Sequence, residues 1–294
     1  MQNKLYISLI VLFSCLLTAT SGILLKKGMR TANATTAMFF SLTITWIVLG
    51  ILTIFFALDT KFDQKGIVIY SAIGSFAPLV VRYFTYKGID HIGASKSAPI
   101  RSLTPLFAYF FAVVFLGEAL NPPVLIGTIF IVAGTLLLAE KKKNYMSNSD
   151  LKFTYFLFPL TAALLAGIAT NLRKYGFEYM DSPILAAFLT ANSAYFLFTI
   201  FLFTFRKVNL LMFNRNSILF FSLSSFCTAV TILLTLFSLQ HSKVTLVSPL
   251  MASIPLFTLI LSFFFLKKEE TITKSITIGT IVMFLGIQLV IFFT

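Results

Sequence analysis

The sequence predicts an all-α integral membrane protein with ten transmembrane helices, arranged as two inverted five-helix repeats. Three observations predict this fold: an apolar composition, ten long apolar segments, and a second half that repeats the first. Of the 294 residues, 58% are hydrophobic and 11% are charged, and the mean hydropathy is +0.93. Soluble domains contain about 25% charged residues. The composition therefore indicates lipid as the solvent of most of the chain.

Ten apolar segments approach the roughly 20 helical residues needed to cross a bilayer core. They are 5–25, 34–57, 66–88, 93–116, 122–139, 153–172, 183–205, 217–239, 244–266 and 272–293. Each is expected to be a helix, because lipid offers the backbone no hydrogen-bonding partners. The first segment ends in small residues, as a signal peptide does, but it has the length of a full span and is expected to be retained.

The second half of the chain repeats the first at a nearly constant offset. Residues 99–107 (PIRSLTPLF) recur as residues 249–257 (PLMASIPLF), 150 positions later. Five spans in each half is an odd number, so the second copy enters the membrane in the opposite orientation. Such an inverted duplication in an apolar chain is typical of secondary transporters. We divide the chain into a first repeat (1–139), a polar linker (140–152) and a second repeat (153–294).

The last span of each repeat carries a pair of glycines. Gly127 and Gly134 in the first copy correspond to Gly279 and Gly286 in the second. In both pairs the spacing is seven residues, which is two helical turns, so the two glycines share one face. Small residues on one face allow helices to approach closely. These spans are therefore predicted to be scaffold helices at a tight seam.

The positive charge is divided unequally between the two membrane sides. The chain has 23 Lys and Arg against 10 Asp and Glu, a net charge of +13. The N-terminus and the turns after spans two, four, six and eight carry six basic residues, and the other side carries fifteen. The positive-inside rule places the second side in the cytoplasm, with both termini outside. The charge is thus explained by topology and anionic lipid, and nucleic-acid binding is excluded for lack of a basic soluble module.

Residues 93–134 resemble the core of the EamA-type carriers of the drug/metabolite transporter superfamily. The resemblance rests on a proline-rich start of the fourth span, on Phe115-Leu116-Gly117-Glu118, and on a glycine-containing fifth span. It implies a multi-pass protein of the cell membrane. It also implies secondary transport of a small metabolite, often outward, by alternating access around a central cavity. Relatives are usually drawn with both termini in the cytoplasm, opposite to the charge count, so the orientation stays open.

The sequence lacks the residues that several classes of function require. All ten acidic residues fall in turns or at helix ends. The first span has none, which argues against proton-coupled export of cationic drugs. No enzyme motif or extramembrane domain is present, and neither a cofactor nor a metal site is predicted. Cys15 and Cys227 match no ligand spacing and are expected to be small apolar residues. A non-transporting structural or partner-binding membrane subunit remains the alternative.

Two arginines lie within predicted spans. Arg101 is eight residues past Gly93, about 12 Å along the fourth helix, and a central arginine costs at least about 2.5–3.5 kcal/mol to insert. We therefore predict that Arg101, with Arg82, binds the anionic group of an anionic or zwitterionic substrate such as an amino acid. The alternative is an arginine paired with backbone carbonyls. Tyr83, next to Arg82, is predicted either to line the cavity or to belong to the interfacial aromatic belt.

Matched prolines mark where the cavity is expected. Pro99 and Pro105 in span four correspond to Pro249 and Pro255 in span nine, and each removes a backbone hydrogen bond. Broken helices at equivalent positions of two repeats point to a site near the midplane.

Polar side chains near these breaks complete the predicted site. Ser97, Ser248 and Asn171 are candidate substrate contacts, although Asn171 is better explained as a bond between helices. His91 and His241 occupy equivalent turns and could couple a proton to transport; an interface role is the alternative. Any coupling proton or ion is undetermined. Because the duplication supplies both halves of a site, a monomer is sufficient, although a dimer is not excluded.

Overall fold

The computed structural model describes residues 2–57, 60, 63–92, 97, 100–139, 153–205, 209, 211, 214–265 and 274–294. Within these residues the chain is built from helices, and no strand is formed. The helices are α1 (Gln2–Gly28), α2 (Ala34–Phe56), α3 (Gln64–Ile92), α5 (Thr104–Phe115), α6 (Pro122–Ala139), η2 (Phe153–Phe156), α7 (Leu157–Gly176), α8 (Pro183–Thr204), α9 (Arg215–His241), α10 (Val244–Met251), α11 (Ile254–Phe265) and α12 (Lys274–Phe293).

Nine of the predicted spans coincide with described helices within a few residues, and span nine is divided into α10 and α11. Span four is predicted from residue 93, whereas its helix α5 begins at Thr104, and residues 93–96, 98 and 99 lie outside the described residues. In the described part of the chain, seven segments are long and apolar enough to cross a membrane. Three further apolar helices are shorter: Thr104–Phe115, Pro122–Leu138 and Thr277–Phe293. The described part of the chain is thus all-helical, with several helices able to cross a membrane.

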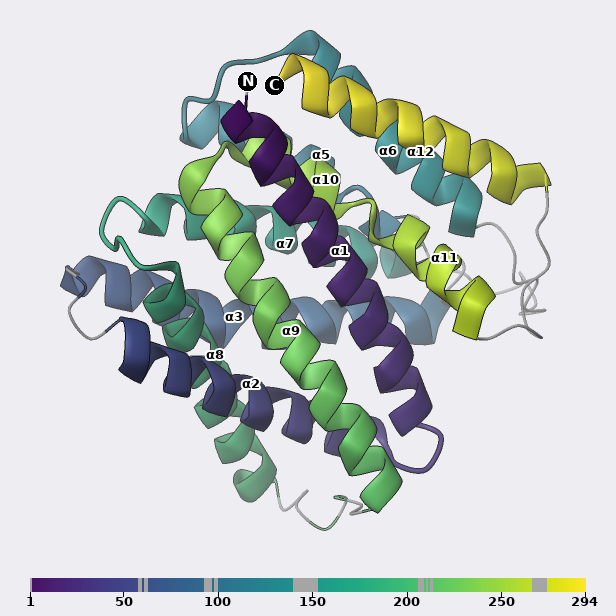
Figure 1. Ribbon diagram of the computed structural model, residues 1–294. Coiled ribbons are helices and arrows are strands. Elements are labelled where there is room, and N and C mark those ends of the chain that lie inside the picture. Colours follow the sequence, from purple (N-terminus) through teal and green to yellow (C-terminus); the bar gives the residue numbers. More distant parts are fainter. Residues whose placement is uncertain are drawn as a thin grey trace.

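Helices of the first half pack mainly on helices of the second half. The principal pairs are α6 with α12, α1 with α9, α3 with α7 and α2 with α8 (Figure 1). In chain order, α1, α2, α3, α5 and α6 of the first half correspond to α7, α8, α9, α11 and α12 of the second. When each helix is replaced by its counterpart, the same contacts result: α1–α9 becomes α7–α3, α5–α7 becomes α11–α1, and α3–α8 becomes α9–α2. The helices of the two halves therefore pack together in one bundle and do not form two separate bundles.

The α6–α12 pair is antiparallel and very close. A Cβ built on Gly134 would lie 2.6 Å from the carbonyl oxygen of Gly279, and one on Gly286 would lie 2.6 Å from that of Gly127. Only glycine permits this approach of two backbones. The predicted tight seam is confirmed, and the structure adds that the two glycine pairs face each other.

The α1–α9 pair is also antiparallel but is joined by hydroxyl groups. Ser21 Oγ lies 2.9 Å from Ser224 Oγ and 2.8 Å from Thr228 Oγ1, and Ser224 Oγ donates to the Ser21 carbonyl at 2.9 Å. Nearer one membrane end, Thr31 and Ser217 share a hydroxyl–hydroxyl bond. In lipid these groups have no water to bond, so each satisfies the other.

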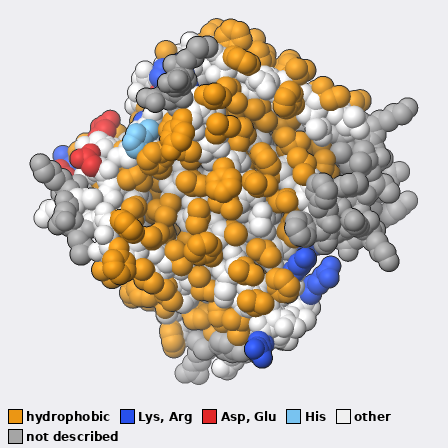
Figure 2. Space-filling model, in the orientation of Figure 1, with side chains coloured by type: hydrophobic (Ala, Val, Ile, Leu, Met, Phe, Trp, Pro, Cys, Tyr) orange, Lys and Arg blue, Asp and Glu red, His pale blue; other side chains and the backbone are white. Residues whose placement is uncertain are grey.

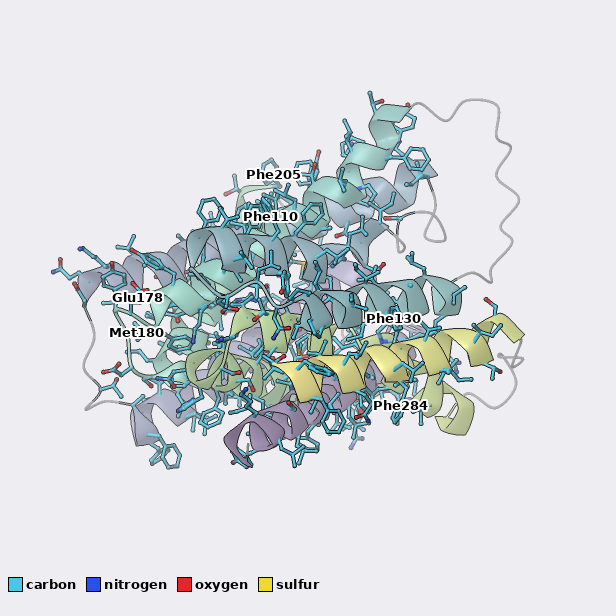
Figure 3. All side chains as sticks on the ribbon, turned by 90° about the horizontal axis from the view of Figure 1, so that it is seen from above. Phe110, Phe130, Glu178, Met180, Phe205 and Phe284 are labelled. Carbon is cyan, nitrogen blue, oxygen red and sulfur yellow. The ribbon has the colours of Figure 1, made fainter. Side chains whose placement is uncertain are left out.

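The outer surface is apolar, as a lipid-facing surface should be. Figure 2 shows one face covered almost continuously by hydrophobic side chains, with basic groups confined to its edges. Phe55, Phe115 and Phe203 are each about 70% exposed. Phe284 lies on the side of α12 that faces away from α6 (Figure 3). These phenylalanines cover the bundle where it meets lipid.

The first and last described residues lie at the same end of the bundle (Figure 1). The Lys4 ammonium donates to the main-chain oxygen of Thr294 at 2.5 Å. An even number of membrane crossings predicts this placement.

Candidate functional site

The two proline-containing segments each contain a helix break. In span nine, α10 ends at Met251, residues Ala252 and Ser253 form a turn, and α11 begins at Ile254 with Pro255 in its first turn. In span four, the turn falls at Ser102 and Leu103. The two turns are 150 residues apart and each precedes the second proline of its span, Pro105 or Pro255. The prediction of a break at Pro249 is wrong, because Pro249 lies inside α10 and the helix continues past it to Met251.

The first break has the same local chemistry. Helix α5 begins at Thr104, and the buried Pro105 occupies its first turn. Proline suits this position because the first helical N–H groups have no partner within the helix. Pro99 lies outside the described residues. Whether these breaks line a cavity stays a prediction.

Carbonyls freed at the breaks are bonded by nearby hydroxyls. Thr104 Oγ1 donates to the Arg101 carbonyl at 2.8 Å, and Ser253 Oγ donates to the Leu250 carbonyl at 2.7 Å. Buried carbonyls without a partner are costly, so these local bonds stabilise the broken geometry. The hydroxyls of Thr104 and Ser253 therefore support the breaks themselves.

The two breaks differ at one equivalent pair, Arg101 and Met251, which are 150 residues apart. Arg101 is half-buried at the first break. At the second, Ser14 Oγ lies 3.3 Å from Met251 Sδ, and Cys15 Sγ and Thr235 Oγ1 each lie 3.9 Å from the same sulfur. One break thus presents a guanidinium and the other a polarisable thioether. Because α5 packs on α10, the helices that adjoin the two breaks are neighbours within the bundle.

Ser97 and Ser248 are both buried near the breaks. Ser97 is 1% exposed, its hydroxyl has no hydrogen-bond partner, and a Cβ on Gly88 of α3 would lie 2.9 Å from its Oγ. Ser248 is 8% exposed on α10. An unbonded buried hydroxyl is uncommon, which keeps Ser97 a candidate contact for a polar ligand.

Asn171 joins two helices. Its Nδ2 donates to the Ala108 carbonyl of α5 at 3.1 Å and to the Gly167 carbonyl of its own helix at 2.9 Å. Its Oδ1 is buried and has no partner. The amide therefore serves as a bond between helices, the alternative that the sequence left open, while its oxygen remains available to a donor.

Tyr83 and Arg82 lie on α3, near its predicted cavity end. The Tyr83 side chain is 57% exposed and contacts Phe84 and the Lys87 ammonium, which lies 5.8 Å from the ring centroid. This exposure favours the aromatic belt over a position in a cavity. The Arg82 side chain lies outside the described residues, so its predicted role stays a prediction.

The residues that sequence reasoning missed are in the Phe115–Glu118 motif. Gly117 has φ +64°, a left-handed conformation that ends α5 and that residues with a Cβ rarely adopt. The turn directs Glu118 to the second repeat. There its Oε1 accepts from the Val244 N–H at 2.6 Å and its Oε2 from the Thr245 N–H at 2.9 Å. Glu118 thus caps the N-terminus of α10.

This cap joins a half-buried carboxylate to two buried amides. Val244 is 0% exposed and Thr245 is 3% exposed, so their amides have no access to another acceptor. A carboxylate at a helix N-terminus also interacts favourably with the helix dipole. Lys174 lies nearby and donates to the Leu239 and Gln240 carbonyls at the end of α9, at 2.8 and 3.2 Å. The motif thereby fixes the first half of the broken span nine.

Comparison with protein-family models identifies the family of this chain. The model of the EamA-like transporter family matches residues 5–139 and 153–292. The chain belongs to the EamA-like transporter family. This makes it a membrane transporter of the drug/metabolite transporter type, and it points to transport rather than to an enzyme.

Two further proteins are similar to this chain. An uncharacterised protein of Methanocaldococcus jannaschii is 30% identical over 105 residues, which are 32% of this chain and 74% of that protein. A solved crystal structure matches with a TM-score of 0.81 over 98% of this chain and 99% of its own, at 13% identity. At that identity the likeness shows the fold alone.

Proposed function

We propose that this EamA-family carrier exports a small anionic or zwitterionic metabolite, such as an amino acid, across the cell membrane by alternating access. Ten spans form two inverted five-helix repeats, 1–139 and 153–294, joined by the linker 140–152. The repeats rock against each other, so that a site at the paired helix breaks opens to one side and then to the other. Substrate moves because it binds the two states with different affinities.

The antiparallel pairing of equivalent helices supports the inverted arrangement. Helices α6 and α12 are the fifth helix of each repeat, and Gly127 faces Gly286 while Gly134 faces Gly279. Helices α2 and α8 are the second helix of each repeat, and the Trp46 Nε1–H donates to Asn192 Oδ1 between them. Two equivalent helices that meet antiparallel are related by a two-fold axis perpendicular to them, which here lies in the membrane plane.

The observation that carries the proposal is the pair of breaks 150 residues apart, in neighbouring helices, with Arg101 at one of them. A helix that only scaffolds a bundle has no need of a break that must be stabilised by Thr104 or Ser253. A half-buried guanidinium there can bind a carboxylate by two parallel charge-assisted bonds. Met251 at the equivalent position would then face the less polar part of the substrate. Ser97 supplies an unbonded hydroxyl in the same repeat.

The test is counterflow uptake into proteoliposomes loaded in turn with anionic, zwitterionic and cationic metabolites. Wild type is compared with Arg101→Ala, Arg101→Lys and the control Arg215→Ala, which removes an exposed arginine at the start of α9. We expect uptake of an anionic or zwitterionic metabolite that falls at least about 100-fold in Arg101→Ala, since a buried hydrogen-bonded charge contributes about 3 kcal/mol. Arg101→Lys should retain part of the uptake, and Arg215→Ala all of it.

Three results would contradict this proposal in different ways. Uptake of a cation that is unchanged in Arg101→Ala would show that the protein is a carrier whose substrate site does not include Arg101. Normal anion uptake in the variant would make Arg101 a structural residue. A well-folded wild type that transports no metabolite of any charge class would favour the non-transporting subunit. Melting temperatures of all variants check that each is folded.

A further inference from the structure

We propose that the hollow beside Lys4 and Thr294 is a binding site for a phosphate-type anion, separate from the transport site. The hollow has a volume of about 360 Å³ and is lined by Lys4, Lys174, Gln240, His241, Ser242, Lys243, Leu246 and Thr294. It lies at the start of α10, whereas the break lies at its end. The eight residues of α10 separate the two by about 12 Å.

Three lysines from distant parts of the chain converge on this hollow. Lys4 comes from the start of α1, Lys174 from the end of α7, and Lys243 from the turn between α9 and α10. By the sequence count, this side of the membrane has only six basic residues, and half of them are here. Membrane topology alone predicts that basic residues are scattered over the membrane surface. The convergence of three lysines on one hollow therefore indicates a local role for them.

The carboxylate near these lysines is already engaged. Glu118 accepts from the two amides at the start of α10. Lys174 and Lys4 donate to main-chain oxygens, and Lys243 is exposed at the N-cap of α10. Among the described residues, no side-chain carboxylate is bonded to Lys4 or Lys243. Three ammonium groups outnumber the acceptors that face them, which are the Glu118 carboxylate and the Thr294 main-chain oxygen bonded by Lys4. The hollow is therefore positive, and the repulsion between like charges is relieved when an anion binds.

The donors fit a phosphate group better than a planar carboxylate. A lysine ammonium is a point charge with three rotatable N–H donors, so several lysines can surround a tetrahedral anion. The hollow is open to the surface. Its anion can therefore be the headgroup phosphate of an anionic lipid or a free phosphate compound. Either would tie α1 of the first repeat to α7 and α10 of the second.

The test measures thermal unfolding of the full chain in uncharged detergent against three additions. These are pyrophosphate, soluble short-chain phosphatidylglycerol, and sodium chloride at matched ionic strength, which controls for screening. We expect saturable stabilisation by at least one phosphate compound and none by chloride. Stabilisation by both compounds means that the phosphate group is sufficient, whereas stabilisation by the lipid alone identifies a headgroup site. Stabilisation by neither overturns the proposal.

Matched variants locate the site. Lys243→Gln and Lys4→Gln should each weaken binding about tenfold, the effect of one charge-assisted hydrogen bond. The control Lys65→Gln removes a lysine from the separate hollow beside Tyr179, where its ammonium lies 5.4 Å from the ring centroid. It should bind like wild type. Equal affinity in all three variants, or equal loss in the control, would show that the anion responds to net charge and not to this hollow.

Because neither lysine is part of the proposed transport site, failure here leaves the Arg101 experiment unaffected. Lys174 is not used as a test variant, since its bonds to the last carbonyls of α9 also support the fold.

Discussion

The two halves of this carrier are joined by two seams of opposite character. At the α6–α12 seam the glycine backbones touch: a Cβ added to any of four glycines would lie 2.6–2.9 Å from a carbonyl oxygen of the opposite helix. These glycines are Gly127, Gly134, Gly279 and Gly286. At the α1–α9 seam hydroxyls such as Ser21 and Ser224 fill the space and exchange hydrogen bonds. Both pairs are antiparallel and both cross between the repeats.

The difference concerns what each seam can do in the rocking motion proposed above. Backbones in contact at glycine have one arrangement, because any shift brings Cβ atoms into the opposite helix. Hydroxyls rotate and can exchange one partner for another, and such bonds between membrane helices contribute only about 0.6 kcal/mol each. We therefore infer that α6–α12 is the fixed seam of the rocking motion and α1–α9 an adjustable one.

The largest effect is expected from breaking the fixed seam. Gly134→Leu would place a branched side chain against the Gly279 carbonyl and the Met283 backbone, 2.6 and 2.8 Å from its Cβ position. We expect a loss of about 3 kcal/mol or more in unfolding free energy, at the upper end for overpacking. The measurement is unfolding in detergent against an SDS titration.

The matched control for this variant is Gly22→Leu. A Cβ at Gly22 meets nothing within 4 Å, so the same change faces open space on α1. It should be neutral or slightly stabilising, because leucine is the better helix former. Equal destabilisation by both variants would mean that the glycine contact has no special part in the seam.

The second effect concerns the charged connection between the halves. Glu118→Ala leaves the buried amides of Val244 and Thr245 without acceptors, at about 1–3 kcal/mol for each. We expect a loss of about 2–4 kcal/mol in unfolding free energy, followed by the same SDS titration. Glu118→Gln, which keeps one acceptor oxygen, should lose about half as much. An unchanged stability in Glu118→Ala would refute the capping role.

A smaller step at the fixed seam is Gly286→Ala. Its Cβ would lie 2.6 Å from the Gly127 carbonyl oxygen, and we expect a loss of about 1–2 kcal/mol after a propensity gain of about 1 kcal/mol. Gly22→Ala gains helix propensity without a steric clash, so its change in unfolding free energy should have the opposite sign. The comparison uses the melting temperatures of both variants, and the same sign in both would argue against backbone contact at α6–α12.

The smallest effect is expected at the adjustable seam. In a double-mutant cycle of Ser21→Ala and Ser224→Ala, the coupling energy should be about 0.6 kcal/mol, because each hydroxyl has a second partner in the seam. Counterflow uptake by the double variant should remain within about threefold of wild type, since the seam has no single required arrangement. A coupling above about 2 kcal/mol would show that this seam is as rigid as α6–α12.

Much of the fold could be predicted because its causes are local. Apolar runs of bilayer length specify helices wherever they occur, and prolines suit the first turn of a helix, where Pro105 and Pro255 lie. Pro78 and Pro249, by contrast, lie inside helices. The repeat in the sequence then predicts that a break in one half has a counterpart in the other. The glycine spacing likewise predicts a close approach, since seven residues return to the same helix face.

The candidate site was less predictable because its residues depend on neighbours distant in sequence. Nothing local distinguishes Asn171 as a bond to α5, or Tyr83 as an exposed ring. Glu118 is visible as part of a motif, yet its acceptor role depends on amides 126 and 127 residues away. For Arg101 the sequence supplies a buried charge and a reason to expect an anion.

The sequence by itself determined that the chain lies in lipid, where its helices form, that its halves are duplicated and where the helix breaks lie. It could do so because hydropathy, helical period and the missing proline N–H act within a few residues. Only the tertiary structure decided which faces meet. It paired Gly134 with Gly279, placed the Glu118 carboxylate on α10, and brought Lys4, Lys174 and Lys243 around one hollow. Those outcomes depend on how two halves fit together, and packing between distant segments leaves no periodic signal in the chain.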